Sequence, residues 1–180
     1  MRYPLVLLIM TFILVGCKSP DARPPVIVKS GSFIKESAKR NRALNEKERE
    51  EIQKVIANLE DKDFRSSENG FWYHYNSKAE NDSITPKFGD QLEYSYNVSD
   101  LNGNEIYSKN DIGTQYYTMD KEELFSGLRE GLKLMKASEN ITFIFPSQKA
   151  YGYYGDDNKI GTNVPLIYNV TLKTISQNND

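Results

Sequence analysis

The side chains of this chain that could do chemistry are mainly aromatic. The sequence has 12 Tyr and 8 Phe, but only 1 His and 1 Cys. The lone His74 has no second His or neighbouring Cys with which to hold a metal ion, and no Ser/His/Asp set is recognisable. Asp156-Asp157-Asn158 is acidic, but it lacks the spaced ligands and terminal Glu of a calcium loop. We therefore expect no metal and no cofactor, and the aromatic side chains taken alone predict an ordinary core.

The single thiol, Cys17, stands at the end of an apolar run. Arg2 precedes the almost wholly apolar residues 4–15, which are too few for a membrane-spanning helix and have the flanks of a signal peptide. The run ends at Leu14-Val15-Gly16-Cys17, which resembles the lipobox of bacterial lipoproteins. We expect residues 1–16 to be a signal peptide and Cys17 to carry a lipid that anchors the protein to a membrane of the cell envelope. The alternative is a plain secretory signal with a chance cysteine.

Composition limits the partners and the means of stabilisation. The chain carries 23 Lys and Arg against 25 Asp and Glu, a net charge of −2, so nothing predicts a nucleic-acid partner or a basic membrane-binding patch. Acyl chains, not charge, would hold the membrane. One Cys excludes an internal disulfide, so the folded part must depend on an apolar core.

Two segments precede the expected domain. Residues 17–43 are rich in Pro near their start and predict a tether. Residues 44–66 predict a helix over positions 45–60, with Asn45 as its cap and Glu48 three residues later. Its apolar face consists of Ile52, Val55, Ile56 and Leu59. This face could pack on the domain or pair with another copy of the chain.

Residues 67–175 have the pattern of an α+β domain, and residues 176–180 form a tail. Residues 91–98 alternate polar with apolar side chains, as a half-buried strand does, and Asn102-Gly103 predicts a hairpin turn after them. The other predicted strands are residues 71–75, 105–107, 115–119, 140–145 and 165–175. Asp120 is expected to cap a short helix that runs through Met135.

Three segments resemble FKBP-type peptidyl-prolyl isomerases in order and spacing. They are residues 125–132 with Met135 following, residues 145–152, and residues 160–172. The whole chain, including residues 31–37 and 71–73, is also similar to the gliding-motility-associated FKBP-type lipoproteins of gliding Gram-negative bacteria. The resemblance implies an antiparallel sheet of five or six strands curled around one short helix, to which this chain adds its N-terminal helix.

The activity that the resemblance implies needs no nucleophile and no cofactor. Rotation about an X–Pro bond takes tens to hundreds of seconds unaided, because amide resonance opposes it with a barrier of ~18–20 kcal/mol. An apolar pocket removes water from the amide, grips the proline ring and favours the twisted state. The resemblance thus implies an isomerase and folding factor for Pro-containing polypeptides of the envelope. A link to gliding motility rests on the resemblance alone.

The resemblance also assigns the pocket. Its nine positions are Tyr96, Ile106, Tyr107, Leu124, Phe125, Leu128, Tyr151, Ile160 and Tyr168. Tyr96 falls on a wall, Leu128 on the floor where many members carry Trp, and the hydroxyl of Tyr151 on the donor to the bound ligand's carbonyl. Leu124 and Phe125 open the central helix, Ile160 closes the roof, and Tyr168 is the aromatic residue of the last strand.

The sequence departs from the family's pattern at Leu128, where many members carry Trp, and at two further places. Ile106-Tyr107 replaces the usual Phe-Asp pair, so the pocket carboxylate is missing there, with Asp100 or Asp111 as candidate substitutes. Ser138 stands where many members have Gly, and residues 153–157 are either a substrate-contacting loop or an exposed tip. The missing carboxylate motivates a second hypothesis, a module that binds Pro-containing segments without useful turnover. A third is a structural lipoprotein that assembles through its 45–60 helix.

Overall fold

The computed structural model describes residues 30–80 and 84–178 of the 180-residue chain. The chain divides into two units, Met1–Glu36 and Ser37–Asp180. The described part of the first unit is the beginning of the helix α2 (Ser30–Ala57), and the rest of α2 belongs to the second. The predicted signal peptide and the predicted lipid site at Cys17 lie outside the described residues. Within the described ranges, no helix is long and apolar enough to cross a membrane.

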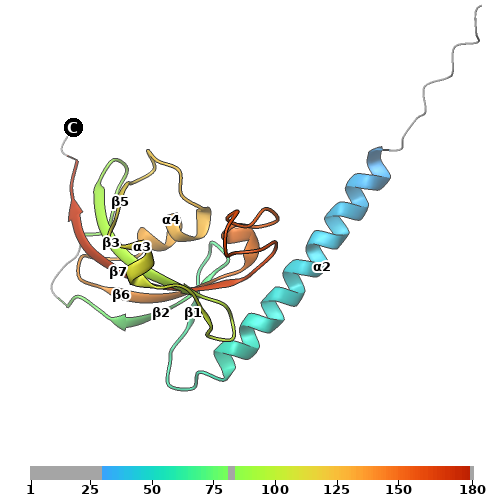
Figure 1. Ribbon diagram of the computed structural model, residues 1–180, viewed down its shortest axis with the longest axis horizontal. Coiled ribbons are helices and arrows are strands. Elements are labelled where there is room, and N and C mark those ends of the chain that lie inside the picture. The colour runs from blue at the N-terminus through green and yellow to red at the C-terminus, as the bar shows by residue number, and fades with distance from the viewer. Residues whose placement is uncertain (1–29, 81–83, 179–180) are drawn as a thin grey trace, which may run out of the picture. The chain divides into compact units, whose positions relative to one another are not determined.

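A seven-stranded antiparallel sheet forms the body of the second unit (Figure 1). Its main path runs β1-β2-β6-β7-β3-β4, and β5 pairs with β3 off this path. The strands are β1 (Arg65–Ser66), β2 (Trp72–Ser77), β3 (Gln91–Ser99), β4 (Glu105–Tyr107), β5 (Gln115–Thr118), β6 (Asn140–Phe145) and β7 (Leu166–Ser176). The α+β prediction is confirmed, and the two-residue β1 is the strand that the sequence did not predict.

Alternation along the central strands places one apolar face against the helix α4 (Ser126–Leu132). Every second residue from Leu166 to Leu172 in β7 is buried, and β3 buries Leu92, Tyr94 and Val98 in a similar way. Leu128 and Leu132 of α4 are fully buried in the same cluster, and Figure 1 shows α4 lying across this face of the sheet. Burial of such side chains contributes roughly 1.5–3 kcal/mol each and is the main source of stability in a domain without disulfides.

The helix α4 is shorter than predicted. It spans residues 126–132, whereas Asp120, the predicted cap, has a positive φ of 58° and lies in a turn. The carboxylate of Asp120 pairs with cations of the helix instead, at 3.7 Å from Arg129 Nε and 3.1 Å from Lys133 Nζ. Gly127 lets the helix approach its neighbours, because a Cβ there would lie 2.6 Å from the carbonyl oxygen of Lys149.

The N-terminal helix begins earlier and ends earlier than predicted. α2 takes in residues 30–43, which were assigned to the tether, and it ends at Ala57, so Asn45 lies inside the helix instead of capping it. Residues 32–57 contain neither Pro nor Gly and are rich in Lys, Glu, Arg and Ala, which have high helix propensity even without an apolar stripe. Glu48 and Ile52 are 3% and 0% exposed in the single chain. The part of the face that carries Glu48 and Ile52 therefore packs on the domain.

Two short helices were not predicted. The helix α3 (Lys109–Ile112) follows β4 and starts with a capping box formed by Ser108 and Asp111. The 3-10 helix η1 (Ser147–Lys149) follows β6 and leads into Tyr151. Both are single turns, which are too short for a hydrophobic period to indicate them. Each of them positions residues at the edge of the candidate site.

Candidate functional site

A small cavity lies between β3, β4, α3, β7 and the loop that follows η1. Its volume is about 150 Å³. It is lined by Tyr96, Val98, Tyr107, Ile112, Tyr151, Asp156 and Tyr168. Since a water molecule takes about 30 Å³ and drug-sized ligands use clefts of about 300–1,000 Å³, this cavity suits one small ring and not a large ligand. Four of the nine predicted pocket residues line it.

The walls are tyrosine and phenylalanine rings in contact with one another. The rings of Tyr96 and Tyr168 stack with centroids 5.1 Å apart, and Phe125 lies 5.3 Å from Tyr151 and 5.4 Å from Tyr168. The Tyr168 hydroxyl donates to the Tyr151 hydroxyl at 3.4 Å. Ring pairs at such distances add about 0.5–1.5 kcal/mol each beyond the area that they bury. The walls are therefore held in place before any ligand arrives.

Burial disfavours ionisation of these hydroxyl groups still further. It raises the pKa of Tyr96 to about 12, with smaller contributions from Tyr151 and Tyr107. Burial also raises the pKa of Tyr168 far above its ordinary value. Tyrosine hydroxyls are protonated at neutral pH and can donate hydrogen bonds.

Leu124 and Phe125 border a second, wider hollow beside the cavity. This hollow measures about 610 Å³, and its other lining residues are Glu122, Glu123, Arg129 and Tyr151. Tyr151 therefore lines both spaces. Leu124 and Phe125, two more of the nine predicted pocket residues, thus line the hollow beside the cavity.

The last three predicted residues lie behind the walls. Leu128 is fully buried and Ile160 is 3% exposed, and both belong to the core cluster. Ile106 packs against that cluster, and its carbonyl oxygen accepts a hydrogen bond from Lys159 Nζ. None of the three lines the cavity, so they shape it from behind. The catalytic roles assigned to all nine residues stay predictions.

The cavity does contain a carboxylate, but it comes from a different part of the chain than position 107. The hydroxyl of Tyr107 donates to Asp156 Oδ2 at 2.5 Å. Asp156 Oδ1 accepts from the backbone N–H groups of Asn158 at 3.0 Å and Ile160 at 2.7 Å. Burial acts to raise the pKa of Asp156, but the hydrogen bonds from Tyr107, Ile160 and Asn158 outweigh it and lower the pKa. The carboxylate is therefore ionised at neutral pH.

Asp100 and Asp111, which were considered as substitutes, serve local structure instead. Asp100 accepts hydrogen bonds from the backbone N–H groups of Asn102 and Asn104 and closes its own hairpin turn. Asp111 caps α3 together with Ser108. Neither lines the cavity. Both expectations were wrong because short polar side chains in turns bind their own backbone first.

The loop between Tyr151 and Ile160 turns inward at Asp156. Gly155, with φ of 74°, makes this possible, because a Cβ there would collide with the Ile160 carbonyl oxygen. Tyr153 and Tyr154 are 72% and 85% exposed, so these two side chains form the tip while Asp156 reaches the cavity. Sequence reasoning missed Asp156, although an acid directly after Gly between two predicted pocket residues was a usable signal.

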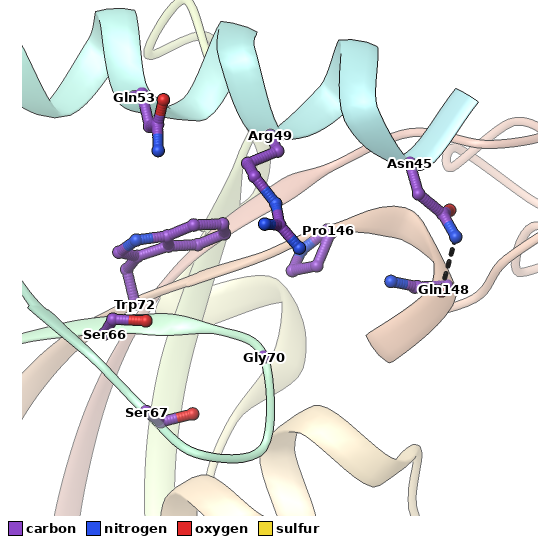
Figure 2. Close-up of a pocket in the computed structure, with 9 residues that line it drawn as sticks. All are labelled: Asn45, Arg49, Gln53, Ser66, Ser67, Gly70, Trp72, Pro146 and Gln148. Carbon is purple, nitrogen blue, oxygen red and sulfur yellow. Dashed lines mark hydrogen bonds between the residues drawn. The ribbon is translucent and has the colours of Figure 1, made fainter. Parts of the chain in front are cut away.

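A third cavity lies between α2 and the domain (Figure 2). It measures about 360 Å³ and is lined by Asn45, Arg49, Gln53, Ser66, Ser67, Gly70, Trp72, Pro146 and Gln148. The Asn45 side-chain amide donates to Gln148 Oε1 at 3.0 Å across one end of it. In the described part of the chain, no group of three or more His, Cys, Asp or Glu residues is arranged to hold a metal ion.

The sequence and the fold both match known proteins. The profile of the FKBP-type peptidyl-prolyl cis-trans isomerases matches residues 82–173, just over half of the chain, and that range contains all nine predicted pocket residues. The FKBP-type isomerase FkpA of Aeromonas hydrophila is 27% identical over 149 residues, covering 83% of this chain and 53% of the relative. Human isomerase FKBP9 is 31% identical over 100 residues, which are 55% of this chain and 17% of that protein. The chain thus spans about half or less of the length of these relatives.

Two solved structures share the fold. The crystal structure of FkpA from Escherichia coli has a TM-score of 0.61 at 20% identity and covers 96% of this chain and 81% of its own. A peptidyl-prolyl isomerase from Pseudomonas syringae has a TM-score of 0.58 at 21% identity, covering 76% and 96%. The family profile, which spans more than half of the chain and the residues that build the aromatic cavity, shows that the chain belongs to the FKBP-type peptidyl-prolyl cis-trans isomerase family.

Proposed function

We propose that the protein is a peptidyl-prolyl cis/trans isomerase acting on Pro-containing polypeptides. The observation that carries the proposal is the cavity of about 150 Å³ walled by Tyr96, Tyr151 and Tyr168, in a chain of this family. The space suits a proline ring, and the wider hollow beside it has room for the flanking peptide.

The geometry supports catalysis by differential binding. In the twisted amide the C–N bond loses resonance, so the carbonyl carries less charge separation and is more stable in apolar surroundings than the planar amide. The rings of Phe125, Tyr96 and Tyr168 supply those surroundings, and the Tyr151 hydroxyl can donate to the bound carbonyl oxygen. The reaction is a rotation about the C–N bond in which no covalent bond is formed or broken, so no nucleophile is required.

The pair of Tyr107 and Asp156 supports the site in a different way from a single pocket aspartate. The carboxylate already accepts hydrogen bonds from Tyr107, Asn158 and Ile160. It is held in place by them and fixes the loop over the cavity. We expect it to set the shape of the mouth, with the tyrosine hydroxyl as its point of attachment.

The test is catalysed refolding of a protein whose slow phase is limited by one cis-proline. The full chain, purified in mild detergent, is expected to accelerate that phase. Tyr151→Phe should lower kcat/KM about tenfold, equivalent to about 1.4 kcal/mol, because it removes one hydroxyl that acts on the twisted state. Tyr153→Phe, on a 72% exposed residue, is the matched control and should leave the rate unchanged. Equal rates for the two variants would contradict the role of Tyr151.

A second candidate function is binding of Pro-containing segments without turnover. Tyr107 in place of the usual acid is the observation that favours it. It predicts that a Pro-containing peptide binds with measurable affinity while the slow refolding phase is unchanged. Titration of the chain with such a peptide, beside the refolding experiment, therefore separates the two candidates.

We further propose that the protein is a lipoprotein of the cell envelope that folds exported clients, with a role in gliding motility. Leu14-Val15-Gly16-Cys17 and the similarity of the chain to gliding-associated lipoproteins support this. Labelling with a radioactive fatty acid should mark the wild-type chain and not Cys17→Ala. Loss of the gene should impair surface spreading, and restoration by the wild type but not by Tyr151→Phe would tie motility to the site.

A further inference from the structure

The helix α2 lies outside the region that matches the family, yet it carries a buried carboxylate aimed at the site's supporting loop. Glu48 is 3% exposed, and its partner Ser147 is 2% exposed. The family match begins at residue 82, so this contact joins a helix that precedes the matched region to a residue inside it. An acid is buried only where hydrogen bonds or charges compensate for its lost hydration, so its partners are informative.

Both carboxylate oxygens of Glu48 bind Ser147. The backbone N–H of Ser147 donates to Oε2 at 2.8 Å, and its hydroxyl donates to Oε1 at 2.6 Å. Hydrogen bonds to an ionised acceptor are shorter and stronger than neutral ones, and two from one residue fix both its position and its rotation. Glu48 therefore holds the first residue of η1 in one orientation.

Ser147 in turn holds both neighbours of Tyr151. Its carbonyl oxygen accepts from the N–H of Ala150 at 3.0 Å and from the N–H of Gly152 at 2.8 Å. The carbonyl oxygen of Gly152 accepts from the N–H of Asn163 at 2.8 Å. The residue that presents its hydroxyl to the cavity is thus flanked on each side by a bond to the residue that Glu48 fixes.

Two further residues of α2 keep Glu48 in register with Ser147. Asn45 donates to the side chain of Gln148, as Figure 2 shows, and Ile52 is fully buried. Positions 45, 48 and 52 recur at the spacing of one helix face. The contact is therefore a continuous stripe and not a single surface bond.

We propose that Glu48 is a positioning residue for the isomerase site, acting through Ser147 to set the orientation of Tyr151. The effect on catalysis rests on the proposed function. The claim that Glu48 fixes the backbone around Tyr151 does not depend on it. The activity of the domain then depends on a helix that precedes the family region, and a fragment confined to that region would have a misplaced Tyr151.

Three variants of the full chain test this. Glu48→Ala removes both acceptors. Glu48→Gln keeps both hydrogen bonds but reverses the direction of one. Its carbonyl accepts from the Ser147 N–H, and its NH₂ group donates to the Ser147 hydroxyl. Ser147→Ala removes one of the two bonds and provides a milder perturbation if Glu48→Ala does not fold. Glu50→Gln, on an exposed residue of the same helix, is the control for loss of charge.

Two readouts are compared: cis/trans exchange of an X–Pro peptide by NMR, and hydrogen exchange of single amides. We expect Glu48→Ala to lower kcat about tenfold with little change in KM, and to speed exchange at Ala150 and Gly152 at least tenfold while Val170 in β7 is unchanged. Glu48→Gln should keep most of the wild-type kcat and most of the protection of these two amides. Glu50→Gln should match the wild type in both. Where Glu48→Ala is unfolded, Ser147→Ala should show the same selective pattern at about threefold.

Specific results overturn the proposal. Uniform acceleration of exchange across the sheet would make Glu48 a residue of general stability only, and unchanged exchange at Ala150 and Gly152 would show that it does not hold the loop. A wild-type chain without isomerase activity would refute the proposed function instead, and the amide exchange would still decide whether Glu48 positions Tyr151.

Discussion

Replacing Gly155 by Ala tests whether the loop geometry that brings Asp156 to the cavity is as constrained as the structure indicates. Gly155 has φ of 74°, and an added Cβ would collide with the carbonyl oxygen of Ile160. That oxygen also accepts the N–H of Asp156 at 3.1 Å, so it cannot move away without breaking this bond. The substitution therefore combines backbone strain, a steric clash and a threatened hydrogen bond.

The loss of stability in Gly155→Ala can be estimated by comparison with Gly103, a glycine that also has a positive φ. Gly103 has φ of 85° but nothing within 4 Å of its added Cβ. Gly103→Ala should cost about 1 kcal/mol, the left-handed strain less the entropy that the unfolded chain loses. Gly155→Ala carries that cost plus about 1–3 kcal/mol of overpacking, a total of about 2–4 kcal/mol.

Urea unfolding of both variants, followed by tryptophan fluorescence, measures the difference. Proline-peptide binding should weaken in Gly155→Ala and not in Gly103→Ala, because only the former displaces the carboxylate. A loss of stability in Gly155→Ala equal to that in Gly103→Ala, with unaltered binding, would refute the reasoning. The loop would then be able to accept a Cβ at position 155 without the clash that the structure indicates.

Three other predictions follow from single residues. Ser138 has φ of 68°, so Ser138→Gly should relieve left-handed strain and raise the free energy of unfolding by about 1 kcal/mol in urea titrations; a decrease would contradict this. Leu128 is fully buried, so Leu128→Ala should cost about 3–5 kcal/mol in the same assay, and a cost below 1 kcal/mol would show that the site collapses freely. The pKa of Asp156 is lower in the folded state than in the unfolded chain, so its contribution to stability is complete above the unfolded-state pKa and is lost as pH falls towards the folded-state pKa. Asp156→Asn should therefore reduce the loss of stability between neutral pH and about pH 3, and an unchanged pH profile would count against the hydrogen-bonded carboxylate.

The strands could be predicted because their signal is local. The alternation over residues 91–98 corresponds to β3 at 91–99, and the apolar run at 140–145 corresponds to β6 with the same bounds. A half-buried strand must alternate, whatever it pairs with, so its sequence alone indicates it. The strand order could not be read in this way, since it depends on which strands meet across long separations.

The helices were harder to predict because their ends depend on distant partners. Asp120 has the type and spacing of a helix cap, but the cations at Arg129 and Lys133 hold its carboxylate in another place. α2 extends through residues 30–43 on propensity alone, without the apolar stripe by which a surface helix is usually recognised.

The candidate site was predicted in its walls but not in its carboxylate. The aromatic positions were assigned through the resemblance of the sequence to the family. Asp156 meets Tyr107 across a separation of 49 residues, and this meeting depends on the left-handed turn at Gly155. The sequence at position 107 does not show which segment supplies the carboxylate, and the signal lies instead in the acid that directly follows Gly155.

The most direct test of the central claim is NMR exchange spectroscopy on a short peptide with one X–Pro bond. Without a catalyst the cis and trans signals interconvert over tens of seconds or longer and show no exchange cross-peaks. A catalytic amount of the full chain is predicted to produce cross-peaks, and a proline-containing competitor should abolish them. Absence of cross-peaks, with the peptide shown by titration to bind, would contradict the isomerase and leave the cavity as a binding site.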